Sequence, residues 1–295
     1  MAAGFRTEKI VLGTVQFGLN YGISNTKGQV PLEEVCRIVD YAYNHGVTTL
    51  DTAAAYGESE IILGKALKET GLKFNIISKL PLVQSAGEVR KIVEASLYKL
   101  GVSTLQGYML HSFSIYQQHP EVLEQLYLLE EEGLISNIGF SLYHPSEAQE
   151  LLEKNINFNL TQFPYSVFDQ RFDEVMPALK TKGIETHVRS VFLQGLFFMQ
   201  PYSLPPYFAG VADSLRSLQN KAIKAAIPLE AVLMHFVLNQ PNIDKIVIGV
   251  DSLTALQENL SINQYASQVQ SLIPELKKYK VADENILLPY KWNIA

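Results

Sequence analysis

Four side chains capable of acid–base chemistry lie close to the ends of three successive apolar segments. Asp51, Lys79 and His111 each follow such a segment, 28 and 32 residues apart, and Tyr56 lies five residues beyond Asp51. Each has a plain structural explanation alone, because Asp favours helix N-caps and turns, Lys is usually solvated, and a strand-end His can simply bond backbone. Three consecutive segments ending in Asp, Lys and His are much harder to obtain by chance, which favours one shared site.

Short apolar runs alternate with amphipathic patterns along the whole chain, and this alternation predicts strand–helix units. The predicted strands are Ile10–Gly13, Val47–Leu50, Asn75–Ser78, Gly107–Leu110, Ile135–Phe140, Asn157–Thr161, Glu185–Val188 and Lys245–Ile248. The predicted helices are Leu32–His45, Ser59–Glu69, Gly87–Leu100, Pro120–Glu132, Pro145–Lys154, Arg171–Lys182, Val211–Ala225 and Leu253–Ile262, with an extra helix at Leu229–Asn239. Strands that are apolar on both faces and followed by helices are typical of parallel sheets.

These units predict an α/β protein with a (β/α)8 TIM barrel fold, in which side chains at the carboxyl ends of the strands share one face. An open doubly wound sheet needs a glycine-rich phosphate loop after its first strand. The segment 13–18 reads GTVQFG and lacks that spacing, so the barrel is favoured. We expect one domain, with a barrel core at about 10–263 and a tail at 264–295. Because only Met1–Lys9 precede the first strand, we expect a shortened N-terminal hairpin.

Composition excludes several classes of protein. The 295 residues include 24 Lys plus Arg and 30 Asp plus Glu, so the net charge is 24 − 30 = −6; 47% are hydrophobic and 18% are charged. An acidic chain is a poor match for phosphate-neutralising nucleic-acid binding, and no apolar run approaches the roughly 20 residues of a membrane span. The single cysteine, Cys36, indicates a reducing compartment. We expect a cytoplasmic protein with no nucleic-acid or membrane partner, and no His or Cys cluster suggests a metal.

The segment Leu50–Gly57, LDTAAAYG, resembles the signature of the aldo-keto reductase family. Ile77–Lys79 (ISK), Met109–His111 (MLH) and Gly64 extend the resemblance, which covers about Leu12 to Leu260 in the family's order. It implies an oxidoreductase that transfers a hydride between a nicotinamide dinucleotide and an aldehyde or ketone, or the corresponding alcohol.

The resemblance also implies the roles of the four side chains. Tyr56 would donate the proton, and the ammonium of Lys79 would lower the pKa of that phenol. Asp51 would keep Lys79 charged and in place, and His111 would orient the carbonyl oxygen. Two alternatives stay open: a non-catalytic dinucleotide-binding sensor or scaffold, and a Schiff-base lyase that uses Lys79.

Cofactor-binding positions follow from the same resemblance. They are Gly13, Thr14, Asp51, Ser141, Gln162, Arg189, Ser190, Phe192, Gln194, Gly195, Gly249, Asp251, Ser252, Glu258 and Asn259. The family usually has Asn after Ser141, where this chain has Leu142. Arg189 stands where the family often has an aromatic residue, and it could stack on the nicotinamide, bind an anionic substrate or cofactor phosphate, or form a structural salt bridge.

The family implies NADP(H), whose 2′-phosphate is usually held by basic residues after the eighth strand. Here Asp251 replaces the usual arginine, and residues 248–259 contain no Lys or Arg. A carboxylate repels a phosphate but can bind a ribose hydroxyl, which predicts weaker selectivity for NADP(H) and use of NAD(H). The alternative is that Asp251 only caps the next helix.

The substrate is expected to be a small carbonyl compound such as a sugar or small aldehyde, by analogy with relatives. Phe17, Tyr165 and Trp292 are the predicted substrate contacts, because aromatic walls suit apolar carbonyls and sugar rings alike. The sequence leaves the oligomeric state and the physiological direction open.

Overall fold

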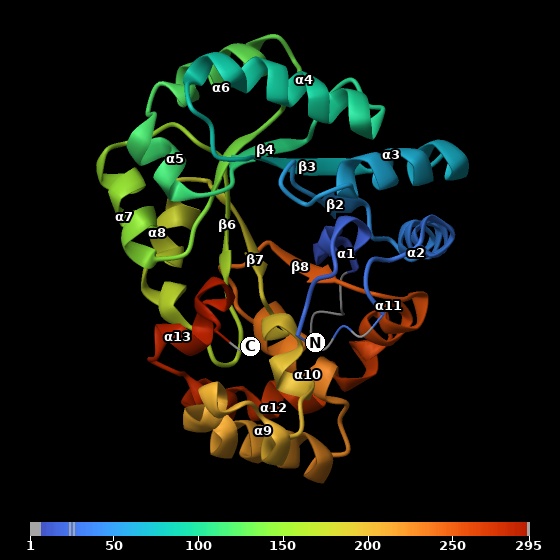
Figure 1. Ribbon diagram of the computed structural model, residues 1–295. Helices are drawn as coiled ribbons and strands as arrows, with labels where there is room; N and C mark the ends of the chain where they lie inside the picture. Colours follow the sequence, from blue (N-terminus) through green and yellow to red (C-terminus); the bar gives the residue numbers. More distant parts are fainter. Residues whose placement is uncertain (1–6, 24, 26, 294–295) are drawn as a thin grey trace.

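Eight parallel strands close into a barrel in sequence order, each pairing with its neighbours and β8 pairing with β1 (Figure 1). The structure is a computed structural model that describes residues 7–23, 25 and 27–293. The strands are β1 (Ile10–Gly13), β2 (Thr49–Asp51), β3 (Asn75–Leu80), β4 (Gly107–Leu110), β5 (Ile138–Ser141), β6 (Leu160–Pro164), β7 (Glu185–Arg189) and β8 (Lys245–Gly249). The predicted barrel is confirmed.

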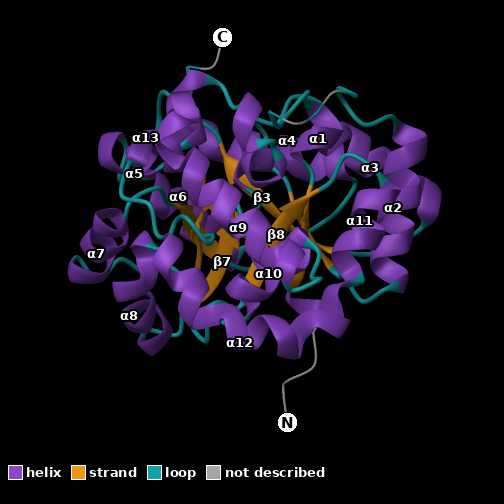
Figure 2. Ribbon diagram, turned by 90° about the horizontal axis from the view of Figure 1, so that it is seen from below, coloured by secondary structure: helices purple, strands orange, loops and turns teal. Residues whose placement is uncertain are grey.

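Helices surround the strands on the outside, and Figure 2 shows this arrangement from below. They are α1 (Val15–Gly18), α2 (Leu32–Asn44), α3 (Ser59–Thr70), α4 (Val89–Leu100), α5 (Phe113–Gln118), α6 (Val122–Glu131), α7 (Pro145–Glu153), α8 (Met176–Thr181), α9 (Ala212–Lys224), α10 (Leu229–Leu238), α11 (Leu253–Leu260), α12 (Ala266–Leu276) and α13 (Glu284–Leu287). The 3-10 turns are η1 (Thr7–Lys9), η2 (Ala86–Glu88), η3 (Arg171–Glu174), η4 (Leu193–Phe198), η5 (Pro201–Ser203), η6 (Pro206–Val211), η7 (Ile262–Tyr265), η8 (Lys277–Tyr279) and η9 (Pro289–Lys291).

The predicted helix Arg171–Lys182 is wrong in one respect, because it is divided into η3 and α8. Pro177 stands in the first turn of α8, and proline has no N–H with which to continue a helix from the preceding turn. Residues 1–6, where the expected hairpin would begin, lie outside the described residues, and η1 leads directly into β1. Within the described part of the chain, no helix combines the length and apolar character needed to cross a bilayer.

The interior of the barrel is a small apolar cluster that is separate from the large core under the helices. It consists of Ile77 from β3, Met109 from β4 and Leu160 from β6, all at most 3% exposed. Side chains two positions apart on a strand point the same way. Lys79, His111 and Gln162 are therefore directed to the same side as these three residues, one step nearer the carboxyl ends.

Gly64 is the point where α3 and α4 approach most closely. A Cβ atom at this position would lie 2.0 Å from the carbonyl oxygen of Lys99, and backbone cannot move aside as a flexible side chain can. The glycine therefore sets the distance between two helices that cover the strands carrying Asp51 and Lys79.

We expect Gly64→Ala to lower the free energy of unfolding by about 1–3 kcal/mol, although Ala is the better helix former. Urea denaturation measures the change. Gly87→Ala is the matched control, because the nearest atom to its added Cβ is Ser85 Oγ at 3.7 Å. Equal stability of the two variants would contradict the close approach of α3 and α4.

Candidate active site

A buried ion pair joins the carboxyl ends of β2 and β3. Lys79 Nζ lies 2.5 Å from Asp51 Oδ1 and donates a second hydrogen bond to the carbonyl oxygen of Thr52 at 2.9 Å. The two side chains are 1% and 4% exposed. Burial lowers the pKa of Lys79, while the Asp51 carboxylate opposes that shift. The pair places a compensated positive charge at the floor of the site.

Gln162, in the middle of β6, makes the second side-chain contact to the Asp51 carboxylate. Its Nε2 donates to Asp51 Oδ2 at 2.8 Å, so both carboxylate oxygens of Asp51 are engaged. Gln162 Oε1 is buried and has no hydrogen-bond partner among the described residues. A buried amide oxygen without a partner is costly, so this atom is well suited to accept a hydrogen bond from a ligand.

Tyr56 and His111 stand together above the ion pair. Their rings meet edge to face with centroids 5.5 Å apart, and Lys79 Nζ lies 5.1 Å from the centroid of the Tyr56 ring. Burial, followed by the charge of Asp51, raises the pKa of Tyr56 well above its usual range, and Arg189 opposes the shift. The expected lowering by Lys79 does not prevail, because Asp51 compensates the ammonium at 2.5 Å.

His111 is held in its neutral form. Burial, together with the positive charges of Lys79 and Arg189, lowers the pKa of His111 to about 3. A neutral imidazole has one N–H to donate and one nitrogen to accept. At neutral pH the ring can therefore donate a hydrogen bond without carrying a charge.

A cavity of about 260 Å³ opens above these residues at the carboxyl ends of the strands. A second cavity of about 280 Å³ adjoins it and shares several lining residues. The shared residues are Gln16, Tyr21, Phe192, Gln194 and Gly249. Together the two cavities form one elongated groove. We call the first cavity, which Tyr56 and His111 line, the catalytic end, and the second cavity the far end.

Most of the sequence-predicted residues line this groove. Those at the catalytic end are Gly13, Thr14, Asp51, Tyr56, His111, Ser141, Gln162, Arg189, Ser190, Phe192, Gln194 and Gly249. Those at the far end are Phe192, Gln194, Gly195, Gly249, Asp251, Glu258 and Asn259. Lys79 lies behind Asp51 and does not line the cavity, and neither does Ser252.

Ser252, and not Asp251, caps helix α11. Its Oγ accepts from the backbone N–H of Ala255 at 3.3 Å and donates to Asp251 Oδ1 at 3.0 Å. The alternative in which Asp251 caps the helix is therefore replaced by the neighbouring serine. Glu34 of α2 adds to this end, because its Oε1 accepts from the backbone N–H of Leu253 at 2.7 Å.

The far end of the groove is acidic. Asp251, Glu258 and Glu230 all line it, and no lysine or arginine is among its lining residues. A helix N-terminus would normally attract an anion, but at α11 the carboxylate of Glu34 already occupies that position. Glu34 is itself paired with Arg37 Nη2 at 2.5 Å, so a phosphate group at this end would be repelled chiefly by the lining carboxylates of Asp251, Glu230 and Glu258.

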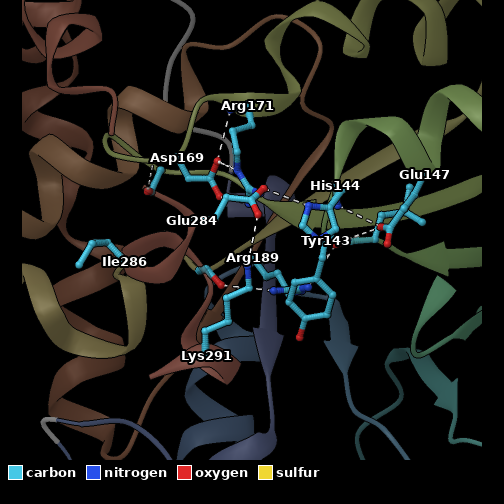
Figure 3. Close-up of polar contacts among 12 residues, drawn as sticks. Tyr143, His144, Glu147, Asp169, Arg171, Arg189, Glu284, Ile286 and Lys291 are labelled. Atoms are coloured by element: carbon cyan, nitrogen blue, oxygen red, sulfur yellow. Dashed lines mark hydrogen bonds and ion pairs between the residues drawn. The ribbon is translucent and has the colours of Figure 1, made fainter. Parts of the chain in front are cut away.

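Arg189 ends β7 and projects over the catalytic end. Its guanidinium carbon lies 4.3 Å from the centroid of the Tyr143 ring, and Nη2 donates to the carbonyl oxygen of Leu142 at 3.2 Å (Figure 3). No carboxylate among the described residues lies within 4.0 Å of the guanidinium, so the structural salt bridge considered for this residue is not formed there.

The three predicted substrate contacts do not reach the groove. Phe17 is fully buried in the main core, and the hydroxyl of Tyr165 donates to Asp173 Oδ1 at 2.8 Å beneath the rim. Trp292 packs edge to face on Phe208 and donates to the carbonyl oxygen of Ile286. These side chains are structural, because each is occupied by packing or hydrogen bonds within the fold. The aromatic wall of the catalytic end is formed instead by Tyr21, Tyr143 and Phe192.

Several lining residues are not among the predicted site residues, including Gln16, Tyr143 and Glu230. Tyr143 follows Ser141 by two residues, and its ring meets that of Tyr290 edge to face at 4.8 Å. Gln16 lies against Gly249, and its buried Oε1 has no partner within the described residues. Position just after a strand end is the available signal, but neither the loop at Tyr143 nor the four-residue helix α1 at Gln16 has a periodicity that shows where its side chains point.

The C-terminal tail is attached to the rim near Tyr143 through Glu284. Glu284 Oε1 accepts from Arg171 Nη1 at 2.8 Å and lies 3.1 Å from His144 Nδ1, and Oε2 contacts Lys291 Nζ at 3.3 Å (Figure 3). Arg171 in turn pairs with Asp169 at 2.8 Å. The tail is thus fastened to the loops after β5 and β6.

Comparison with known proteins places this fold and site in one family. A model described as the Aldo/keto reductase family matches residues 9–278. The oxidoreductase YqkF of Bacillus subtilis is 23% identical over 270 residues, which is 83% of this chain and 87% of that protein. The NADH-specific methylglyoxal reductase of Escherichia coli is 25% identical over 262 residues, which is 75% of this chain and 79% of that protein.

A solved aldo-keto reductase of Bacillus halodurans, in a holo form, shares the fold with a TM-score of 0.76 at 22% identity. The match covers 94% of this chain and 95% of that one. Since the family model spans nearly the whole chain, the protein belongs to the aldo/keto reductase family. It is accordingly an NAD(P)H-dependent oxidoreductase that acts on small-molecule carbonyl compounds.

The depressed pKa of His111 predicts a pH dependence of stability. The folded state disfavours protonation of this ring, so its contribution is complete above the unfolded pKa of about 6.5 and is lost as pH falls towards about 3. When the pH is lowered from 7.5 to 4.5, we expect the free energy of unfolding of the wild type to fall by about 2–3 kcal/mol more than that of His111→Gln. Urea denaturation at both values measures this, with the exposed His45→Gln as control. A wild-type dependence retained in His111→Gln would contradict the assignment.

Proposed function

We propose that Tyr56 is the proton donor and that His111 orients the substrate carbonyl in reduction by a nicotinamide cofactor. The observation that carries the proposal is the stack of groups at the catalytic end: Asp51 and Lys79 form a buried ion pair directly below the Tyr56 ring. When bound, the reduced dinucleotide supplies a hydride to the carbonyl carbon. The protein must then provide a proton to the oxygen.

Tyr56 is suited to that step because its phenol remains protonated in the resting site. Burial and Asp51 raise the pKa of Tyr56, so the proton is retained until a stronger base is present. An alkoxide is such a base, and the phenolate left behind gains the nearby ammonium of Lys79 as a partner. His111, neutral at pH 7, donates its N–H to the same oxygen as charge develops.

The residues at the catalytic end fit a nicotinamide ring. Gln162 Oε1 is a buried acceptor without a partner among the described residues, and an amide N–H₂ is the type of donor it needs. Ser141 lines the same cavity and offers a hydroxyl on the adjacent strand. These two residues would hold the carboxamide, which supports the binding direction with the nicotinamide at this end.

We further propose that NAD(H) is preferred to NADP(H). The acidic far end supports this, since Asp251, Glu230 and Glu258 line it and Glu34 occupies the N-terminus of α11. A 2′-phosphate would be repelled there, whereas a ribose hydroxyl could donate to a carboxylate. The similarity to the NADH-specific methylglyoxal reductase of Escherichia coli agrees with the proposal.

A Schiff-base mechanism is physically disfavoured. An amine must be neutral and accessible to attack a carbonyl, but Lys79 is fully buried and does not line the cavity. Its Nζ also donates to Asp51 and Thr52. We propose instead that Lys79 acts on Tyr56 and does not form a covalent bond with substrate.

Tyr56→Phe tests the proton donor. We expect kcat/KM for an aldehyde to fall by about a hundredfold or more, because positioned proton transfer contributes roughly 10²–10⁴ in rate. The Kd of NADH, measured by fluorescence titration, should remain close to the wild-type value. Tyr98→Phe, on an 88% exposed side chain, is the matched control. A wild-type protein inert to a broad aldehyde panel would instead favour the dinucleotide sensor.

Cofactor preference is tested by kcat/KM with NADH and NADPH. We expect a preference for NADH of about tenfold or more, and Asp251→Arg should reduce it because a cation then faces the phosphate. Asp213→Arg makes the same change of charge on an exposed side chain of α9 and should leave the ratio unaltered. A preference for NADPH of any size would refute the proposal.

A further inference from the structure

We propose that Arg189 is a substrate-specificity residue that binds a carboxylate next to the reacting carbonyl, so that the substrates are oxo acids. The inference rests on the proposed function, because it concerns the same cavity. It follows from the charge, the fixed orientation and the position of the Arg189 guanidinium.

The charge of Arg189 is not compensated by the described part of the protein. Lys79, the other cation nearby, is paired with Asp51 at 2.5 Å, but no described carboxylate lies within 4.0 Å of Arg189. Its guanidinium has five N–H groups, of which one donates to Leu142 O at 3.2 Å and another reaches Ser190 Oγ only at 3.5 Å. The others find no acceptor among the described residues. A partly buried cation with free donors is complementary to an anion.

The guanidinium is held in a fixed orientation. The Tyr143 ring covers one of its faces at 4.3 Å, and the Tyr290 ring supports Tyr143 from the tail. The backbone N–H of Tyr143 donates to Glu147 Oε2 at 2.7 Å, which fixes the loop that carries the ring. A planar fork with a fixed orientation is the arrangement that binds a carboxylate through two parallel hydrogen bonds.

The position of Arg189 distinguishes a substrate anion from the 2′-phosphate of NADP(H). Arg189 lines the catalytic end with Tyr56 and His111, but it does not line the far end, where Asp251 lies. Its field reaches the reacting groups, since its charge opposes the raised pKa of Tyr56 and adds to the lowered pKa of His111. An anion bound there would therefore lie beside the carbonyl that Tyr56 and His111 address.

The size of the cavity limits the distance between the two groups. The catalytic end has a volume of about 260 Å³ and must also admit the nicotinamide ring. The carboxylate must then be close to the carbonyl, as in a 2-oxo acid or a short aldehydo acid. A long-chain carbonyl compound would not fill this site with its anion on Arg189.

The test compares an oxo acid with its uncharged ester, using glyoxylate and methyl glyoxylate with NADH. Arg189→Gln removes the charge, Arg189→Lys keeps it without the fork, and the exposed Arg90→Gln is the control. We expect the ratio of kcat/KM for acid over ester to fall by about 30- to 1000-fold in Arg189→Gln, and less in Arg189→Lys. Arg90→Gln should keep the wild-type ratio.

A binding measurement gives a second readout that needs no turnover. Oxamate, an unreactive analogue of a 2-oxo acid, should bind the wild-type protein with NADH in calorimetry and should bind Arg189→Gln at least about 30-fold more weakly. Inorganic phosphate that binds more tightly than oxamate would overturn the assignment to a carboxylate.

The remaining outcomes separate the inference from the proposed function. If Arg189→Gln lowers acid and ester turnover equally and weakens NADH binding, Arg189 covers the cofactor ring and the inference is wrong. If the wild type reduces methyl glyoxylate but neither turns over glyoxylate nor binds oxamate, the inference fails while carbonyl reduction stands. If no carbonyl compound is reduced, the proposed function fails and the inference with it.

Discussion

The site depends on the constraint that the ammonium of Lys79 cannot be buried alone. Removing one partner of a buried pair typically costs about 3–5 kcal/mol, because the other charge is left uncompensated. Asp51 therefore has to face Lys79 across two adjacent strands, and its second oxygen is then available to Gln162. One electrostatic requirement thus links β2, β3 and β6 and fixes the ion pair that lies beneath the Tyr56 ring.

The same requirement changes how Tyr56 is tuned. A free ammonium would lower the pKa of a nearby phenol, which is what the residue types alone suggest. Because Asp51 compensates Lys79, burial and the carboxylate dominate, and the phenol is kept protonated. In the proposed mechanism Lys79 matters most when a phenolate forms, so its contribution would belong to the proton-transfer step more than to the resting state.

The periodicity of strands explains which parts of the site could be predicted. Lys79, His111 and Gln162 lie two positions beyond Ile77, Met109 and Leu160, so an alternating pattern already places all three above the apolar interior. Lys79, His111 and the barrel itself follow from spacing, whereas Gln162 is predicted from the family resemblance.

Tyr143 and Tyr165 lie in loops, and Gln16 and Phe17 lie in α1, which has only four residues. Neither setting has a periodicity long enough to show which way a side chain points, so Tyr143 and Gln16 are not predicted and Phe17 and Tyr165 face the core instead of the groove. An aromatic residue near a strand end can point to the core or to the rim, and only tertiary packing decides between them. The predicted helix Arg171–Lys182 is divided for a similar reason. Its apolar periodicity continues through Pro177, but the missing N–H of that proline interrupts the hydrogen bonds between η3 and α8.

The net charge of −6 conceals a division along the groove. The catalytic end contains an uncompensated guanidinium at Arg189, whereas the far end is lined by Asp251, Glu230 and Glu258. An elongated ligand with negative charge at its far terminus would be repelled by the carboxylates of the far end, and it would leave the guanidinium of Arg189 at the catalytic end without a partner. The two proposals, a dinucleotide without a 2′-phosphate and a separate anionic substrate, together match the charges of both ends.

The loop that joins the two ends is strained in a way that fits this division. Ser190, Leu193 and Gln194 have φ values of 63°, 46° and 51°, and such left-handed conformations cost non-glycine residues roughly 1 kcal/mol or more each. Two hydrogen bonds to the loop after β1 stabilise this backbone conformation. Ile23 N–H donates to Gln194 O at 3.1 Å, and Gln194 Nε2 donates to Tyr21 OH at 2.9 Å. Since Tyr21 and Gln194 line both cavities, these bonds fix the passage between the acidic end and the guanidinium. The shape of the groove is therefore set by the backbone, while the proposed selectivity would come from the charges at its two ends.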